Sequence, residues 1–309
     1  MYKILITGGA GYKGTKLAEA FLKQGHKVTI LDNFIFGFNP VLGFVDNENC
    51  TILKRDIRNI CESDLKEFDF IFHLAGISGY PACEANPHAA EVVNVNSTKK
   101  IVSFLAKEQV LVYASTTSFY GSSGDVKDEN SVPEPVSLYG KTKYEAEKIC
   151  MERENSIALR FATLFGVSRR MRCDLLVNDF VYKAINERSL VLFDSKSIRT
   201  YLHLKDAVKA YQMTLEQTDK MKNAVFNVGS NDMNFSKLEL AKRINKHVDF
   251  KIIDSDLPDF DVRNFVINYD KINKLGFKAD ISIDEGIREL VKLYSFYKPF
   301  SMYQALESL

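Results

Sequence analysis

The chain has 309 residues, of which 46% are hydrophobic and 26% are charged. Its 41 basic and 40 acidic side chains leave a formal net charge of +1, which argues against a dedicated binder of nucleic acid or of an anionic membrane. The 22 Phe and 14 Tyr argue against a disordered chain, and only 16 Gly and 7 Pro argue against a collagen-like one.

The cysteines and the first residues indicate a soluble protein of a reducing compartment. The five cysteines are odd in number and scattered, which argues against a disulfide framework and against a structural zinc site. A strand-like segment begins at residue 3, so we expect no signal peptide. No apolar stretch approaches the roughly 20 residues that span a bilayer. We therefore expect a cytoplasmic protein without a bound metal.

Short apolar segments alternate with helical periods in the first half of the chain. The predicted strands are Lys3–Thr7, Lys27–Leu31, Thr51–Lys54, Asp69–Leu74, Val110–Ser115 and Ile157–Phe161. The predicted helices are Thr15–Lys23, Ala89–Lys107 and Tyr139–Glu154. This alternation predicts an α/β fold with a Rossmann-type doubly wound parallel sheet, whose strands are buried on both faces.

After about Phe165 the rhythm changes to helices separated by short strands. The predicted helices are Leu175–Asn186, Leu204–Glu216, Ser236–Lys246 and Asp284–Tyr297, and the predicted strand is Ala224–Val228. Ser236 and Glu239 form the pattern of a capping box. Because no low-complexity linker separates the two parts, we expect residues 1–165, with interleaved later segments, to form the Rossmann domain. Residues 166–309 would form mainly a smaller α/β lobe docked on it.

The strongest local pattern is a glycine-rich loop between the first strand and the first helix, with the sequence TGGAGYKG over residues 7–14. Glycines without a Cβ let the backbone turn tightly and approach a pyrophosphate, which unpaired N–H groups of the helix N-terminus bind. Gly14 allows close packing of the helix on the strand. Alone, the pattern also fits a tight turn before a helix.

Asp32 ends the second strand, about 20 residues beyond this loop, where a carboxylate accepts the ribose hydroxyls of a dinucleotide. Its negative charge repels a 2′-phosphate, so NAD is favoured over NADP. Lys13, inside the loop, adds a positive charge that weakens the preference for NAD over NADP. An isolated Asp at a strand end is otherwise an ordinary surface residue.

A possible acid–base group follows in the middle of the chain. Tyr139 and Lys143 stand four residues apart on a predicted helix, so they share one face. An ammonium beside a phenol favours the phenolate and lowers the tyrosine pKa from its usual value of about 10. The Ser/Thr-rich segment 115–118 ends the fifth strand, where a hydroxyl can bind a reacting oxygen. Each pattern alone is common on protein surfaces and in loops.

In this order, Gly-x-x-Gly-x-x-Gly, the Ser/Thr strand end and Tyr-x-x-x-Lys resemble the extended short-chain dehydrogenase/reductases. More narrowly, nearly the whole chain is similar to the NAD-dependent nucleotide-sugar epimerase/dehydratase group. The resemblance implies Thr116, Tyr139 and Lys143 as catalytic residues, with Lys143 also holding the nicotinamide ribose. The cofactor-binding residues that it implies are Gly8, Gly11, Tyr12, Lys13, Gly14, Asp32, Asn33, Asp56, Ile57, Leu74, Ala75, Gly76, Asn94, Tyr139 and Lys143.

The resemblance also implies that the second lobe binds the substrate. Arg199 and Arg263 match positions that grip the diphosphate, a task for which the planar guanidinium is suited. The other substrate-binding residues implied are Thr117, Ser118, Thr163 and Asn178. Arg169, Arg170 and Arg172 add local positive charge or form a solvated turn. The helices 89–107 and 139–154 resemble the pair that forms a dimer interface in relatives, so we expect a homodimer.

The departures from the family narrow the function. Thr117 and Ser118 stand where sugar 4,6-dehydratases carry an acid pair, which disfavours dehydration. Thr163 replaces an Asn that is common in the sixth-strand motif. The run 164–180 is similar to that of GDP-heptose 4-dehydrogenases, and other motifs resemble those of UDP-glucose 4-epimerases. His73 lies at the end of a predicted strand and has no nearby acidic partner in the sequence, so we interpret it as a packed residue beside the cofactor loop and not as a base.

The combined prediction is NAD-dependent oxidoreduction at carbon 4 of a nucleoside-diphosphate sugar. A 4-epimerase and a 4-dehydrogenase stay open, because both need the same three side chains and the same cofactor. A 4-ketoreductase is an alternative and a 4,6-dehydratase a weaker one. A non-enzymatic alternative is a scaffold that senses NAD or nucleotides, against which the intact set Thr116, Tyr139 and Lys143 argues.

Overall fold

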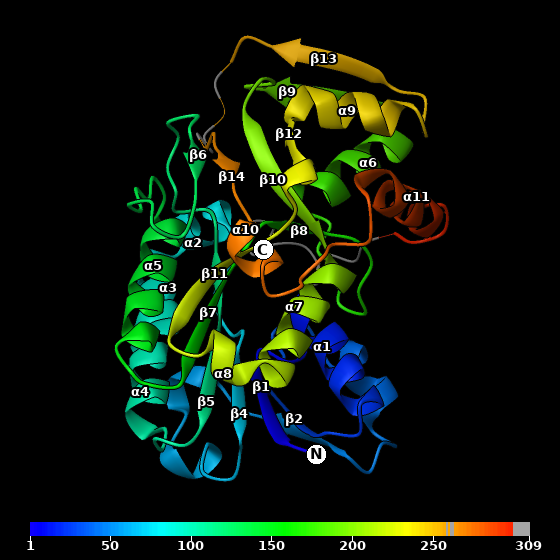
Figure 1. Cartoon of the computed structure of the whole chain (residues 1–309). Coiled ribbons are helices and arrows are strands. Elements are labelled where there is room, and N and C mark those ends of the chain that lie inside the picture. Colours follow the sequence, from blue (N-terminus) through cyan, green and yellow to red (C-terminus); the bar gives the residue numbers. More distant parts are fainter. Residues whose placement is uncertain (258, 260–262, 299–309) are drawn as a thin grey trace.

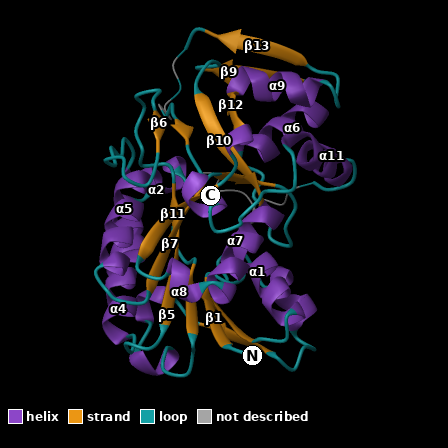
Figure 2. Cartoon of the chain, in the orientation of Figure 1, coloured by secondary structure: helices purple, strands orange, loops and turns teal. Residues whose placement is uncertain are grey.

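The computed structural model describes residues 1–257, 259 and 263–298. Its largest sheet has seven parallel strands in the order β11-β7-β5-β4-β1-β2-β3 (Figures 1 and 2). They are β1 (Lys3–Thr7), β2 (Lys27–Asp32), β3 (Cys50–Lys54), β4 (Phe70–His73), β5 (Val110–Thr116), β7 (Ser156–Phe161) and β11 (Ala224–Val228). All seven coincide with predicted strands to within one residue at each end. The doubly wound parallel sheet is therefore confirmed.

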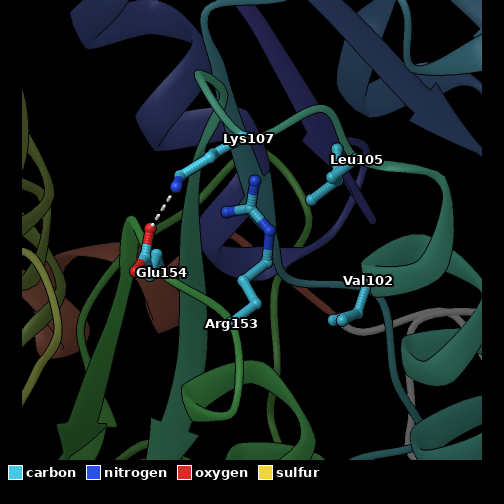
Figure 3. A pocket seen from close by; sticks show the side chains of 5 residues that line it. All are labelled: Val102, Leu105, Lys107, Arg153 and Glu154. Atoms are coloured by element: carbon cyan, nitrogen blue, oxygen red, sulfur yellow. Dashed lines mark ion pairs between the residues drawn. The ribbon is translucent and has the colours of Figure 1, made fainter.

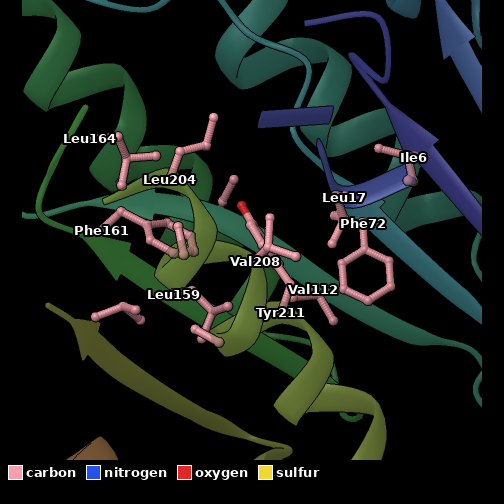
Figure 4. Close-up of a cluster of buried hydrophobic side chains, with 14 of the residues drawn as sticks. Ile6, Leu17, Phe72, Val112, Leu159, Phe161, Leu164, Leu204, Val208 and Tyr211 are labelled. Atoms are coloured by element: carbon pink, nitrogen blue, oxygen red, sulfur yellow. The ribbon is translucent and has the colours of Figure 1, made fainter. Parts of the chain in front are cut away.

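Alternate residues of each strand enter two different hydrophobic clusters, which explains the continuous apolar runs. In β1, Ile4 and Ile6 pack under α1 (Tyr12–Lys23) and α7 (Leu204–Glu216), together with Phe72 and Tyr211 (Figure 4). Leu5 points to the other face and joins the cluster that contains side chains of α4 (Ser97–Phe104) and α5 (Leu138–Met151). Both faces are thus covered by helices, as strands buried on two sides require.

The segment predicted as one helix over 89–107 is divided into three parts in the structure. These are α3 (Pro87–Glu91), a π-helical stretch over Val92–Asn96, and α4. Wider π-helical turns place single side chains that a regular α-helix would direct elsewhere, and they are frequent at functional sites. Here the inserted turn carries Asn94, which is buried against the segment after β4.

The second lobe is built from short strands and from helices that pack beside them (Figure 1). Its strands are β8 (Thr163–Phe165), β10 (Ile198–His203) and β12 (Asn234–Ser236) in one sheet, the pair β9 (Ser189–Phe193) and β13 (Lys251–Ser255), and the pair β6 (Val126–Lys127) and β14 (Val266–Ile267). Its main helices are α6 (Leu176–Asn186), α9 (Lys237–Asn245) and α11 (Ile283–Tyr294). Besides α3, short α-helices of the described chain are α2 (Tyr80–Ala85), α8 (Thr218–Met221) and α10 (Asp270–Asn273).

The capping box predicted in the second half of the chain is confirmed. The chain also passes from the second lobe back to the large sheet. Ser236 and Glu239 form the predicted capping box of α9, and Ser282 and Glu285 form a second one at α11. After β10, the chain returns to the large sheet through α7 and β11. The division at residue 165 stays a prediction; the small sheet takes its first strand, β8, from residue 163 onward. Across the described ranges, no helix is long and apolar enough to cross a membrane.

Candidate active site

The parallel sheet brings most of the predicted site residues to one edge. The strands β1, β2, β4, β5 and β7 all run in the same direction, so their carboxyl ends lie together, and ligands of open α/β sheets bind there. The glycine-rich loop, Asp32, the segment after His73 and the segment after β5 therefore belong to one region.

The glycine-rich loop has the close backbone packing that its sequence predicts. Gly8 has a φ of +68°, and a Cβ on it would lie 2.7 Å from the backbone nitrogen of Ala75. A Cβ on Gly14 would lie 2.5 Å from the carbonyl oxygen of Gly8. The first turn of α1 has no side-chain cap at Gly11 and no acidic residue, so its N–H groups stay available to an anion. The loop therefore fits a dinucleotide pyrophosphate.

Asp32 ties the loop to the end of β2. Its carboxylate accepts hydrogen bonds from the N–H groups of Ala10 (3.0 Å) and Phe34 (2.9 Å), and burial raises the pKa of the carboxyl. Asn33 is exposed, and its side chain accepts a bond from the N–H of Ile35. Asp32 thus stands beside the loop, at the position predicted for a ribose-binding carboxylate.

Asp56 and Ile57 follow β3 and have local partners that the sequence did not reveal. The Arg58 guanidinium donates to both carboxylate oxygens of Asp56 at 2.9 and 2.7 Å, and these bonds lower the pKa of Asp56 to about 2. The side chain of Ile57 is buried. A ligand that used the Asp56 carboxylate would share it with Arg58.

The segment after β4 is held by Asn94 from the π-helical turn. The amide of Asn94 accepts a bond from the N–H of Ile77 (2.8 Å) and donates to the carbonyl of Ile77 (3.0 Å) and to the hydroxyl of Thr142 (3.1 Å). A Cβ on Gly76 would lie 2.9 Å from the Asn94 oxygen. Asn94 thus joins this segment to α5, the helix that carries Tyr139.

His73 is a packed residue, as predicted. Its two ring nitrogens lie 2.8 and 2.9 Å from the hydroxyls of Thr7 and Thr98, and burial lowers its pKa to about 3. The same Thr7 hydroxyl accepts a bond from the N–H of Ala75, and the Thr7 carbonyl accepts one from the N–H of Leu74. His73 therefore stays neutral near pH 7 and joins β1 to the helix behind the sheet.

The predicted pair Tyr139 and Lys143 lies at the start of α5. The N-cap hydroxyl of Ser137 accepts a bond from the N–H of Gly140 at 3.1 Å, which fixes the first turn. Lys143 is only 7% exposed, and its Nζ lies 4.1 Å from the ring centroid of Tyr113. Burial lowers the pKa of Lys143 to about 8. Tyr139 is half-buried on the same helical face.

The Ser/Thr segment is buried and internally bonded. The Thr116 hydroxyl donates to the Ser118 hydroxyl at 2.9 Å and accepts a bond from the Ser118 N–H at 3.1 Å. The Thr117 hydroxyl donates to the carbonyl of Phe161 at 3.2 Å. Arg263, from the second lobe, donates to the Ser118 hydroxyl at 2.6 Å. Two residues predicted to bind substrate are thus in direct contact, beside Thr116.

A buried ion pair behind this segment was not predicted. Arg160 of β7 binds both oxygens of Glu147 on α5, with contacts of 2.6 to 3.1 Å, and Ser115 of β5 donates to Glu147 at 2.6 Å. Arg160 also donates to the hydroxyl of Tyr120 at 2.6 Å. The pair therefore links β5 and α5, which carry Thr116, Tyr139 and Lys143, to β7. The sequence signal would have been the apolar context of Arg160 within LRF at 159–161.

Lys13 points toward the same end of the sheet. It lies in the first turn of α1, and its Nζ is 5.0 Å from the ring centroid of Phe161, the last residue of β7. Burial lowers its pKa to about 7, and the positive charges of Lys143 and Arg172 add to this effect. Tyr12, its neighbour, instead donates to the carbonyl of Gly166 at 2.8 Å. The two loop residues therefore have different roles.

The basic segment after β8 lies against α1 and is not a solvated turn. Ser168 donates to the carbonyl of Tyr12 at 2.8 Å. Arg170 is 3% exposed and lies 3.9 Å from the ring centroid of Phe36, and its Nε has no hydrogen-bond partner in the part of the chain that is described. Arg172 forms a bidentate pair with Asp174. Only Arg169, whose side chain is 40% exposed, fits the alternative of a solvated turn.

The remaining predicted substrate residues belong to the second lobe. Arg199 on β10 is buried. Burial raises the pKa of Tyr201, and the positive charges of Arg199 and Arg263 oppose this rise. Thr163 is half-buried in β8. Asn178 is fully buried, and its amide accepts a bond from the N–H of Gly166 and donates to the carbonyl of Arg172. Its amide thus braces the basic segment.

A surface pocket of about 350 Å³ lies at the opposite edge of the sheet (Figure 3). Its lining includes Lys107, before β5, and Arg153 and Glu154, before β7. Lys107 pairs with Glu154 at 3.0 Å, and Arg153 donates to backbone carbonyls. Because these residues precede the strands, the pocket lies away from the predicted site residues. Among the described residues, no group of His, Cys, Asp and Glu side chains could hold a metal ion.

Comparison with known proteins identifies similar chains. The model of the NAD dependent epimerase/dehydratase family matches residues 4–229. A Bacillus subtilis protein described as an uncharacterized UDP-glucose epimerase is 31% identical over 233 residues, which cover 69% of this chain and 72% of that protein. The UDP-glucose 4-epimerase of Corynebacterium glutamicum is 26% identical over 270 residues, or 79% of this chain and 81% of that one.

Solved structures show the same fold. The UDP-glucuronic acid 4-epimerase of Bacillus cereus, solved with UDP-glucuronic acid and NAD, superposes with a TM-score of 0.81. The superposition covers 95% of this chain and 99% of that one, at 23% sequence identity. At this identity the likeness supports the fold alone.

Proposed function

Because the chain belongs to the NAD-dependent epimerase/dehydratase family, we propose that it oxidises carbon 4 of a nucleoside-diphosphate sugar. The observation that carries this proposal is the position of Thr116, Tyr139 and Lys143. All three lie at the carboxyl edge of the sheet that also holds the glycine-rich loop. NAD, when bound, supplies the acceptor and donor of hydride for such a reaction.

The three side chains have separate tasks in this proposal. The Tyr139 phenol oxygen takes the proton of the carbon-4 hydroxyl, and the Thr116 hydroxyl binds the same oxygen and orients it. The buried Lys143 ammonium stabilises the phenolate, since a charge acts strongly in a poorly solvated site. Glu147 and Arg160 hold β5, β7 and α5 in register behind them, so they position these groups without contacting substrate.

The cofactor would lie along the edge of the sheet. Gly8, Gly11 and Gly14 let the first turn of α1 meet the pyrophosphate, and Asp32 accepts the ribose hydroxyls. Leu74, Ala75 and Gly76, with Asn94 behind them, would border the other end. Arg170, buried beside Phe36 with an unpaired Nε among the described residues, adds a positive charge that an anionic ligand can neutralise.

The substrate diphosphate would meet the second lobe. Arg263 already contacts Ser118, so a group bound by this guanidinium lies close to Thr116. Arg199 and Arg172 add positive charge from β10 and from the segment after β8. Thr117 and Ser118 carry no carboxyl group, which leaves water elimination from the sugar without the acid pair that it uses in 4,6-dehydratases.

Tyr139→Phe tests the central role. The variant should lose 10²-fold or more of its turnover, in the range that general acid–base groups contribute, while NAD binds with nearly unchanged affinity in a direct titration. Tyr144→Phe is the matched control, because it removes a hydroxyl from the same helix, on a ring that packs against Phe119. Turnover retained by Tyr139→Phe would remove Tyr139 from the role of base.

The cofactor state distinguishes the two open outcomes. An epimerase returns hydride to the other face of the ketone, so absorbance at the NADH band stays constant while the sugar inverts. A dehydrogenase releases the ketone and leaves reduced cofactor behind. Thermal-shift screening of UDP-, GDP-, CDP- and dTDP-sugars with NAD would first identify the substrate, because a bound ligand raises the melting temperature.

The same proposal includes a homodimer in the cytoplasm that serves carbohydrate biosynthesis. Helices α4 and α5 pack side by side on one face of the large sheet, as the family resemblance implies for a dimer interface. The five cysteines are free thiols, a state typical of reducing compartments. Sedimentation equilibrium gives the oligomeric state directly, and a monomer at all concentrations would contradict the dimer.

A further inference from the structure

The glycine-rich loop carries a cation, the ammonium of Lys13, that lies at the end of β7. The Nζ of Lys13 lies 5.0 Å from the ring centroid of Phe161 and is directed toward the end of β7. Among the residues that the structure describes, no carboxylate forms an ion pair with Lys13. The charge therefore contributes to the surroundings of whatever occupies this end of the sheet.

Register places this charge beside the proposed reaction centre. Phe161, on which the Lys13 ammonium lies, is the strand partner of Thr116. Lys143 and Arg172 are close enough to lower the pKa of Lys13 further, beyond the larger effect of burial. Arg172 is already paired with Asp174, so below about pH 7, where both lysines are protonated, the region carries an excess of positive charge.

An excess of positive charge distinguishes the two redox states of a nicotinamide. The oxidised ring is a cation, and gain of a hydride, two electrons and a proton, makes it neutral. A nearby ammonium repels the oxidised ring and does not repel the reduced one. At a separation of several Å and an effective dielectric constant near 20, such a repulsion corresponds to about a tenfold preference or more.

We propose that Lys13 shifts the bound cofactor toward its reduced form. The inference depends on the proposed function, which places the reacting end of NAD beside Thr116 and Tyr139. The electrons come from the carbon-4 C–H bond of the sugar: its hydrogen would leave as hydride to the nicotinamide, the C–O bond becomes C=O, and the hydroxyl proton goes to the Tyr139 phenolate. Lys13 favours this oxidation by charge and takes no part in the transfer itself.

Equilibrium binding tests the proposal without turnover. Dissociation constants of NAD, NADH and ADP-ribose are measured for the wild type and for Lys13→Met at about pH 6, below the Lys13 pKa of about 7. The ratio of the NAD constant to the NADH constant should fall about tenfold in the variant, or about 30 mV for a two-electron couple. ADP-ribose lacks the nicotinamide, so its affinity should change little. Lys16→Met, a charge lost from the same helix, is the matched control.

Other outcomes would overturn the proposal. An equal loss of affinity for all three ligands would mean that Lys13 binds the pyrophosphate. An unchanged ratio of the NAD and NADH constants would mean that the Lys13 charge does not act on the nicotinamide. Lys13→Arg keeps the charge and should keep the ratio, which separates charge from folding effects. Failure of the proposed function is recognised separately, because it would appear in the turnover of Tyr139→Phe and not in this ratio.

Discussion

The buried pair between Glu147 and Arg160 provides the sharpest test of what holds the site together. Glu147→Gln keeps the shape of the side chain but removes its charge, which leaves the Arg160 guanidinium buried without a counter-ion. The two side chains are 3% and 6% exposed, so water cannot replace the lost partner. Breaking such a pair by removing one partner costs about 3–5 kcal/mol in free energy of unfolding.

The expected change in melting temperature follows from the size of the chain. With 309 residues and an unfolding entropy of about 2.1 cal/mol/K per residue, the total is about 650 cal/mol/K. A loss of about 3–5 kcal/mol then lowers the melting temperature by roughly 5–8 °C. Urea unfolding followed by circular dichroism measures the same free energy independently.

The control is the exposed pair at the other edge of the sheet. Lys107 and Glu154 are 74% and 69% exposed, so Glu154→Gln should change the free energy of unfolding by less than about 1 kcal/mol. The double variant Glu147→Leu with Arg160→Met, which replaces the buried charges by apolar groups, should recover most of the loss. If Glu147→Gln costs no more than Glu154→Gln, the reasoning is refuted.

Two further predictions concern the loop after β1. Gly14→Ala places a Cβ 2.5 Å from the Gly8 carbonyl oxygen, so α1 must shift; we expect a loss of about 1–3 kcal/mol in stability. NAD affinity should fall with it, and an unchanged affinity in a fluorescence titration would contradict the fit of this loop to the pyrophosphate. Lys13 has its pKa lowered from 10.5 to about 7 by burial, so the folded protein binds fewer protons than the unfolded chain between these values. The stability of the wild type without cofactor should therefore rise with pH between 7 and about 10, relative to Lys13→Met. Melting temperatures of the two proteins that change in parallel over that range would argue against a lowered pKa of Lys13.

Features that depend on local sequence were predictable. Each central strand is a run of four to seven residues buried on both faces, and such a run is visible as continuous apolar sequence in β1 or β5. The loop TGGAGYKG and the pair Tyr139 and Lys143 are likewise local, because a turn and one helical face each involve neighbours in the chain.

Other features had no local signal. Strands β6 and β14 have two residues each, which is too short for any periodicity, and they exist because they pair with each other. The π-helical turn at Val92–Asn96 follows from contacts of Asn94 with Ile77 and Thr142, 17 and 48 residues away. A pattern of neighbours cannot indicate either contact.

The sequence by itself therefore determined the class of fold, the glycine-rich loop and the side chains proposed for catalysis. Tertiary structure alone decided which charges surround them: Lys13 lies on Phe161, Arg263 binds Ser118, and Arg170 is buried where a solvated turn was possible. The physical reason is that strands, helices and turns arise from interactions between residues close in the chain. Burial and charge–charge contacts instead depend on distances between residues that only the folded chain brings together.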